Sequence, residues 1–138
     1  MNKHYYLVFL SLMVFILVSC SNSNDEEYLT RIDIQQVQEH DASEEEEMIV
    51  DLVTLDSIKS ILEEVEWEPN SDTEIVGTEN LIATLFYTDE EEKSDQLYLY
   101  QIWFNSDDSI SIVSSNVDEG YGRLKEEYAD KLKNLLGS

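Results

Sequence analysis

One segment, Leu97–Phe104 with the sequence LYLYQIWF, constrains the fold more than any other part of this chain. Half of its eight residues are aromatic, and aromatic residues favour extended strands. Alternation along a strand divides the side chains between two faces, with Tyr98, Tyr100, Ile102 and Phe104 on one and Leu97, Leu99 and Trp103 on the other. The segment therefore predicts a strand with two apolar faces.

Two further strands are predicted beside it, over 80–87 and 110–114. Short polar segments join the three, and the Asn-Ser-Asp-Asp sequence at 105–108 has typical turn chemistry. Consecutive strands with short connections indicate an antiparallel meander. A short strand at 121–124 and a lead-in strand within 29–37 are further candidates.

Two helices complete the predicted fold. Thr54 is expected to cap a helix over 55–66, in which Ile58, Ile61, Leu62 and Val65 form one apolar stripe. A second helix is expected over about 125–136, ending before Gly137. The predicted class is α+β, with an antiparallel sheet of three to five strands and two helices packed on one face.

The first twenty residues differ from the rest of the chain. A short positive start precedes an apolar run from Tyr5 to Val18, which is shorter than the roughly 20 residues that a spanning helix needs. Leu17-Val18-Ser19-Cys20 resembles the lipobox of bacterial lipoproteins, in which the cysteine is diacylated before cleavage. Residues 1–19 are therefore predicted to be a lipoprotein signal peptide, and Cys20, the only cysteine, to carry the lipid (palmitate or a similar acyl group).

This interpretation divides the chain into three parts and predicts where in the cell the protein is located. The lipidated Cys20, an acidic tether and the lead-in strand occupy 20–47, and a globular domain occupies 48–138. The diacylglyceryl anchor predicts a protein on the extracytoplasmic side of the cell membrane, because two acyl chains anchor stably. The whole chain has a net charge of −23, which argues against a nucleic-acid partner.

The segment from Val50 to Leu136 resembles the YhfM-like domain of small lipoproteins from Gram-positive bacteria. The resemblance is carried by the Leu55-x-x-Ile58-x-x-Ile61 spacing, Tyr100-Gln-Ile-Trp103-Phe, Tyr121 and Leu132-x-x-Leu135-Leu136. This sequence departs from the family in being unusually acidic and in its weak lead-in strand. The resemblance implies a surface location and a packing pattern, and it brings no mechanism.

The usual signatures of catalysis and cofactor binding are missing from the sequence. No Walker loop, Gly-x-Gly-x-x-Gly, His-Glu-x-x-His or cysteine pair occurs, and His40, the only histidine after the signal, lies in a polar stretch. We therefore expect a protein without cofactor that is not an enzyme. Acidic clusters at 44–47, 89–92, 107–108 and 118–119 leave calcium response as an alternative, although none matches an EF-hand loop.

The aromatic strand supplies the binding hypothesis. Tyr98, Tyr100 and Trp103 are candidate contacts for an unknown protein, peptide or glycan, if one face of the strand is exposed. The favoured alternative is that both faces are buried, one by the helices and one by the lead-in segment. The predicted function is thus a membrane-anchored, extracytoplasmic, non-enzymatic accessory or binding domain.

Overall fold

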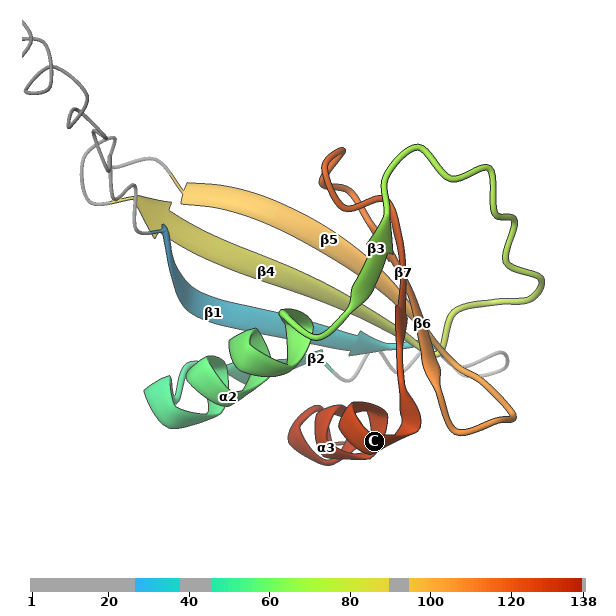
Figure 1. Cartoon of the computed structure of the whole chain (residues 1–138). Helices are drawn as coiled ribbons and strands as arrows, with labels where there is room; N and C mark the ends of the chain where they lie inside the picture. The colour runs from blue at the N-terminus through green and yellow to red at the C-terminus, as the bar shows by residue number, and fades with distance from the viewer. Residues whose placement is uncertain (1–26, 38–45, 90–94, 138) are drawn as a thin grey trace, which may run out of the picture.

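A computed structural model describes residues 27–37, 46–89 and 95–137, and it contains one antiparallel sheet of seven strands (Figure 1). The strands lie in the order β2-β1-β4-β5-β6-β7-β3. They are β1 (Glu27–Gln36), β2 (Glu46–Ile49), β3 (Glu66–Glu68), β4 (Leu81–Asp89), β5 (Asp95–Phe104), β6 (Ile110–Ser114) and β7 (Tyr121–Leu124). Helices α2 (Leu52–Leu62) and α3 (Glu126–Leu135) both lie on one side of this sheet in Figure 1.

The predicted strand number, three to five, is wrong. The meander β4-β5-β6-β7 occurs as expected, and the additional strands are β2 and β3 at the two edges of the sheet. Each is short: β2 has four residues and β3 has three. A segment of that length shows too little alternation for a strand to be recognised in the sequence.

The lead-in segment forms an internal strand next to the edge strand β2, and it does not cover a face of the sheet. β1 pairs with β2 through residues 32–35 and with β4 along nearly its whole length. A β-bulge between Leu29 and Arg31 shifts the register, so that Leu29 and Ile32 both face the core. The described part of the sheet therefore includes residues from Glu27 onward, within the segment that the sequence assigned to the tether and lead-in strand.

Helix α2 starts three residues earlier than expected. Its N-cap is Asp51, not Thr54, and the Asp51 carboxylate accepts hydrogen bonds from the Thr54 backbone N–H at 2.9 Å and from the Thr54 hydroxyl at 2.8 Å. Asp and Thr are both favourable N-cap residues. Asp51 is the N-cap in the structure, and its backbone is extended. The earlier start brings Leu52 and Val53 into the first turn of the helix.

The core lies between the sheet and the two helices. Ile58 and Leu62 from α2 and Leu132 from α3 pack on sheet residues such as Ile32 and Leu85. All five side chains are less than a tenth exposed. The apolar stripe predicted for the first helix therefore faces the sheet, as the helical spacing indicates.

Candidate functional site

Cys20, the predicted lipidation site, lies outside the described residues, as do residues 1–19. The described chain starts at Glu27, seven residues after Cys20. Glu27 pairs with Asp89 at the end of β4, and Thr88 pairs with Asp95 at the start of β5. The chain from Cys20 therefore enters the domain at one defined end of the sheet.

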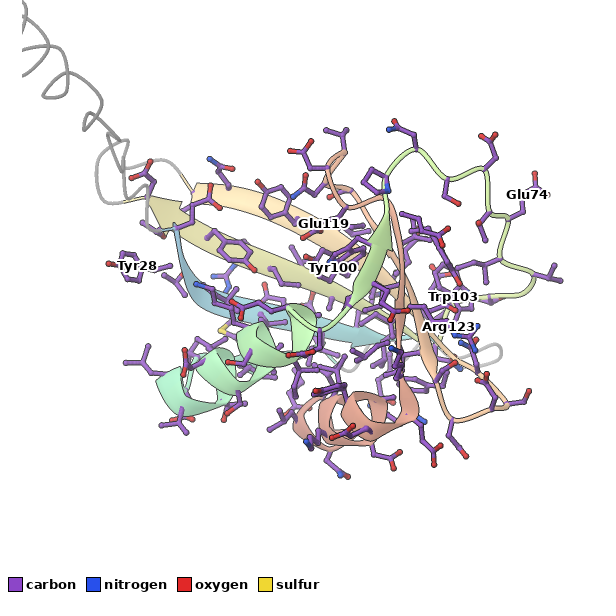
Figure 2. All side chains as sticks on the ribbon, in the orientation of Figure 1. Tyr28, Glu74, Tyr100, Trp103, Glu119 and Arg123 are labelled. Carbon is purple, nitrogen blue, oxygen red and sulfur yellow. The ribbon has the colours of Figure 1, made fainter. Side chains whose placement is uncertain are left out.

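The three aromatic candidates of β5 do not form one surface. Tyr98 and Tyr100 lie on the face that the helices cover, and Tyr100 is only 3% exposed. Trp103 lies on the opposite face, where its indole N–H donates to the Gly77 carbonyl at 3.2 Å. Figure 2 shows Tyr100 and Trp103 on separate parts of the molecule. A ligand that touches all three side chains is therefore excluded by the fold.

Tyr100 belongs instead to a hydroxyl–carboxylate group. Its hydroxyl lies 2.8 and 3.0 Å from the two carboxylate oxygens of Glu119, and the Ser114 hydroxyl donates to Glu119 at 2.6 Å. The loop after β6 carries Glu119 and turns at Gly120, which has a φ of +68°. Glycine favours that conformation, so Gly120 helps to hold Glu119 over the sheet.

Aromatic rings surround this group on the helix face of the sheet. Trp67 makes an edge contact with Tyr100 at a centroid distance of 5.8 Å, and Tyr87 makes one with Tyr98 at 5.7 Å. Trp67 comes from the short β3 and lies over Gly122 of β7, where there is no side chain. A sequence pattern does not show the contact between Trp67 and Tyr100, because these residues are 33 positions apart.

Burial and negative charge keep these tyrosines protonated. Burial, followed by the charge of Glu119, raises the pKa of Tyr87 to about 12. The same two causes raise the pKa of Tyr100 well above its usual range. The pKa of Tyr98 is raised as well, first by burial and then by Glu27. At neutral pH the tyrosine hydroxyls are thus neutral hydrogen-bond donors.

The second face of the sheet is not covered by the lead-in segment, contrary to the favoured prediction. β1 lies within the sheet, and Leu97 and Leu99 of β5 are exposed on that face. The Arg31 guanidinium stacks on the Phe86 ring at 3.7 Å and pairs with Asp33 at 3.1 Å. This face is consequently a mixture of apolar and charged side chains.

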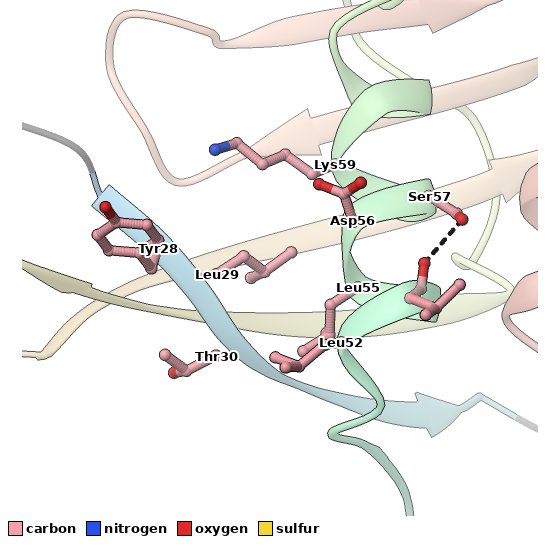
Figure 3. Close-up of a pocket in the computed structure, with 9 residues that line it drawn as sticks. Tyr28, Leu29, Thr30, Leu52, Leu55, Asp56, Ser57 and Lys59 are labelled. Carbon is pink, nitrogen blue, oxygen red and sulfur yellow. Dashed lines mark hydrogen bonds between the residues drawn. The ribbon is translucent and has the colours of Figure 1, made fainter.

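A groove runs between β1 and residues 52–59 of α2 and has a volume of about 490 Å³ (Figure 3). Ligand sites commonly have volumes of about 300–1,000 Å³. The walls are mainly apolar and are formed by Leu29 from β1 and by Leu52, Val53 and Leu55 from α2. The groove is thus open to solvent and lined mainly by apolar side chains.

Polar groups occur around the same groove. Asp56, Ser57 and Lys59 of α2 and Thr30 of β1 line it. The Ser57 hydroxyl donates to the Val53 carbonyl at 2.7 Å, and the Thr30 hydroxyl donates to the Phe86 carbonyl at 3.1 Å. The two hydroxyls are thus hydrogen-bonded to backbone carbonyls, whereas Asp56 and Lys59 place opposite charges beside the groove.

The β-bulge in β1 and the first turn of α2 both lie at the groove. Sequence reasoning missed it, since neither an irregularity in a strand nor a helix start is visible in a hydrophobic pattern. One signal was available: Leu52 and Val53 are apolar but lie outside the stripe formed by Ile58, Ile61, Leu62 and Val65. Apolar residues off the buried stripe of a helix indicate a second surface.

No group of three or more His, Cys, Asp or Glu side chains is arranged to hold a metal ion in the described ranges. Some of the acidic residues behind the calcium alternative, Glu44, Glu45 and 90–92, lie outside those ranges, so that alternative stays a prediction. No helix in the described part of the chain is long and apolar enough to span a bilayer.

A search of solved structures gives one informative similarity. The chain resembles a thioesterase-like protein from Clostridium sporogenes ATCC 15579 with a TM-score of 0.51 and 19% identity. The alignment covers 80% of this chain and 94% of that protein. No family model and no curated protein matches the sequence.

This similarity corrects the prediction that the chain is not an enzyme. The prediction relied on missing motifs, whereas the chain shares its fold with a protein described as thioesterase-like and has a groove. An identity of 19% shows the fold alone. The YhfM-like resemblance is not addressed by these comparisons and stays a prediction.

Proposed function

We propose that this chain is a lipid-anchored extracytoplasmic protein whose domain binds an apolar ligand in the β1–α2 groove. The observation that carries the proposal is the groove itself, with its apolar walls and its volume of about 490 Å³. The lipobox-like sequence ending at Cys20 supports the anchor and the location.

The exposure of the groove walls argues for a ligand. Leu52 is 76% exposed and Val53 is 75% exposed, although both lie in a regular helix beside the core. Full burial of one such aliphatic side chain is worth roughly 1.5–3 kcal/mol. An apolar ligand that covers Leu52 and Val53 would gain part of that free energy of burial, which is not gained while the two side chains are in contact with water.

The ligand that fits best has an apolar body and a small polar end. Leu29, Leu55 and Val53 would contact the body, and Asp56 and Lys59 would face the polar end. A few polar groups in a mainly apolar site fix the orientation of the ligand. The strongly acidic chain disfavours a ligand with several negative charges.

Titration with the neutral dye N-phenyl-1-naphthylamine tests the groove. Val53→Glu places a charge in the wall and is expected to weaken dye binding at least about tenfold. Val76→Glu makes the same change at a side chain that is 96% exposed in the loop between β3 and β4, and it should bind the dye as the wild type does. Equal affinity in all three proteins, or equal loss in both variants, would refute the groove as the site.

The anchor is tested separately by metabolic labelling with palmitate. Cys20→Ser removes the only thiol and should abolish incorporation, whereas Ser21→Ala should retain it. Incorporation that persists in Cys20→Ser would disprove lipidation at this residue without affecting the groove.

Thioester hydrolysis is a second candidate function. The shared fold with a thioesterase-like protein favours it, together with Glu119, a carboxylate held by Tyr100 and Ser114 among aromatic rings. In this reaction a carboxylate takes a proton from water, the water oxygen bonds to the thioester carbonyl carbon, and the C–S bond breaks. The leaving sulfur then receives the proton, which gives an acid and a thiol.

An assay with a series of acyl thioesters decides this second candidate. Glu119→Gln should abolish hydrolysis if Glu119 is the base, and Glu74→Gln, which lies on the loop between β3 and β4 and away from Glu119 in Figure 2, should not. Absence of hydrolysis by the wild-type protein, or equal rates in both variants, would reject Glu119 as a catalytic base.

A further inference from the structure

The start of α2 forms an exposed apolar corner that consists of Val50, Leu52 and Val53. Val50 is 58% exposed, and the other two are about three-quarters exposed. None of them belongs to the buried stripe of the helix, and a surface that exposes several neighbouring aliphatic side chains marks an interaction site. The corner adjoins the groove, because Leu52 and Val53 also line it.

The position of the corner relative to the anchor indicates its partner. Tyr28 lies across the groove from Leu52 and Val53, and it follows Cys20 by eight residues. The seven steps from Cys20 to Glu27 span roughly 25 Å at full extension. The corner is therefore held close to any membrane in which the acyl chains of Cys20 are inserted.

The opposite end of the sheet lies farther from the tether. β4 runs from Leu81, after the loop that contains Val76, to Asp89, which pairs with Glu27. A strand of nine residues is roughly 30 Å long, which separates Val76 from the tethered end by about that distance. Figure 2 shows Tyr28 and Glu74 at opposite ends of the molecule.

We propose that the apolar corner of Val50, Leu52 and Val53 inserts into the surface of the bilayer that holds Cys20, so that the groove opens towards lipid. This docking rests on the lipid anchor of the proposed function. Asp51 and Asp56 flank the corner, and they repel anionic head groups. Apolar insertion, not charge attraction, is therefore the source of binding, and the acyl chain of a membrane lipid is the ligand class within reach of the groove.

The full-length lipoprotein in vesicles tests this docking. Cys20 is the only cysteine, and its thiol is blocked in the acylated lipoprotein of the proposed function, so that an introduced thiol is labelled alone. We would place an environment-sensitive fluorophore at Val53→Cys, at Leu52→Cys as a second position, and at Val76→Cys as the control. Vesicles of phosphatidylcholine would carry a lipid with a quencher on its acyl chain.

Docking predicts that quenching at positions 52 and 53 is at least about fivefold stronger than at position 76. In vesicles that contain phosphatidylglycerol, added salt should strengthen quenching, because it screens the repulsion by Asp51 and Asp56. Equal quenching at all positions, or a loss of quenching with salt, would overturn the docking. Flotation with the vesicles reports the anchor separately: protein that floats without quenching at 52 and 53 retains the anchor and lacks the docking, and protein that does not float has neither.

Discussion

Gly122→Ala should destabilise the domain through one specific collision. A Cβ at this position would lie 2.5 Å from the Trp67 Cε3 and 2.5 Å from the Val65 Cγ1, and both separations are too short for carbon atoms. Overpacking of a dense core typically costs 1–3 kcal/mol. Alanine in a strand recovers roughly 0.5–1 kcal/mol relative to glycine. The middle of each range gives an expected net loss of about 1 kcal/mol in the free energy of unfolding.

Urea unfolding followed by circular dichroism measures this loss. Near-ultraviolet circular dichroism should also change, because a displaced Trp67 loses its edge contact with Tyr100. In a Trp67→Leu background the cost of Gly122→Ala should be smaller, since only the Val65 contact remains. A Gly122→Ala protein as stable as the wild type, or the same cost in both backgrounds, would refute the packing described for β3 and β7.

The remaining predictions concern the tyrosine–carboxylate group and the start of α2. The folded-state pKa of Tyr87 is about 12, above its ordinary value of 10, so the stability it contributes is present below pH 10 and is lost as the pH rises through 12. Between pH 10 and about pH 12 the Tyr87→Phe protein should therefore lose less stability than the wild type, as urea unfolding midpoints measured at several pH values in this range would show. Tyr100→Phe removes a hydrogen bond to a charged group and should cost about 1.5–3 kcal/mol at neutral pH, with an unchanged urea midpoint as the opposing result. Hydrogen bonds from Thr54 hold the pKa of Asp51 below its ordinary 3.8, so that Asp51→Ala should lower the melting temperature at pH 7, and the difference from the wild type should shrink as the pH falls below that value.

The middle of the fold could be predicted because its strands are long and regular. β4, β5 and β6 have clear alternation, and their short polar connections leave few alternatives to an antiparallel meander. The edges could not be predicted. β3 is recognisable only through its pairing with β7, where Trp67 fits over Gly122, and that fit joins segments far apart in the sequence.

The candidate groove depends on two local features, the N-cap of α2 and the bulge in β1. The sequence does not decide either of them. Asp51 and Thr54 are both favourable N-caps, and the choice between them decides whether Leu52 belongs to the helix. The bulge at Thr30 likewise decides which residues of β1 face α2. The aromatic residues of β5 were a clear signal, but they mainly fill the core and the opposite face of the sheet.

An amide chemical-shift titration with N-phenyl-1-naphthylamine tests the central claim, apolar ligand binding in the groove, most directly. The account predicts that the largest shifts fall on 28–30 of β1 and 52–59 of α2, the two segments that line the groove. Shifts centred on Leu97 and Leu99 on the opposite face of the sheet, with none in those two segments, would contradict it.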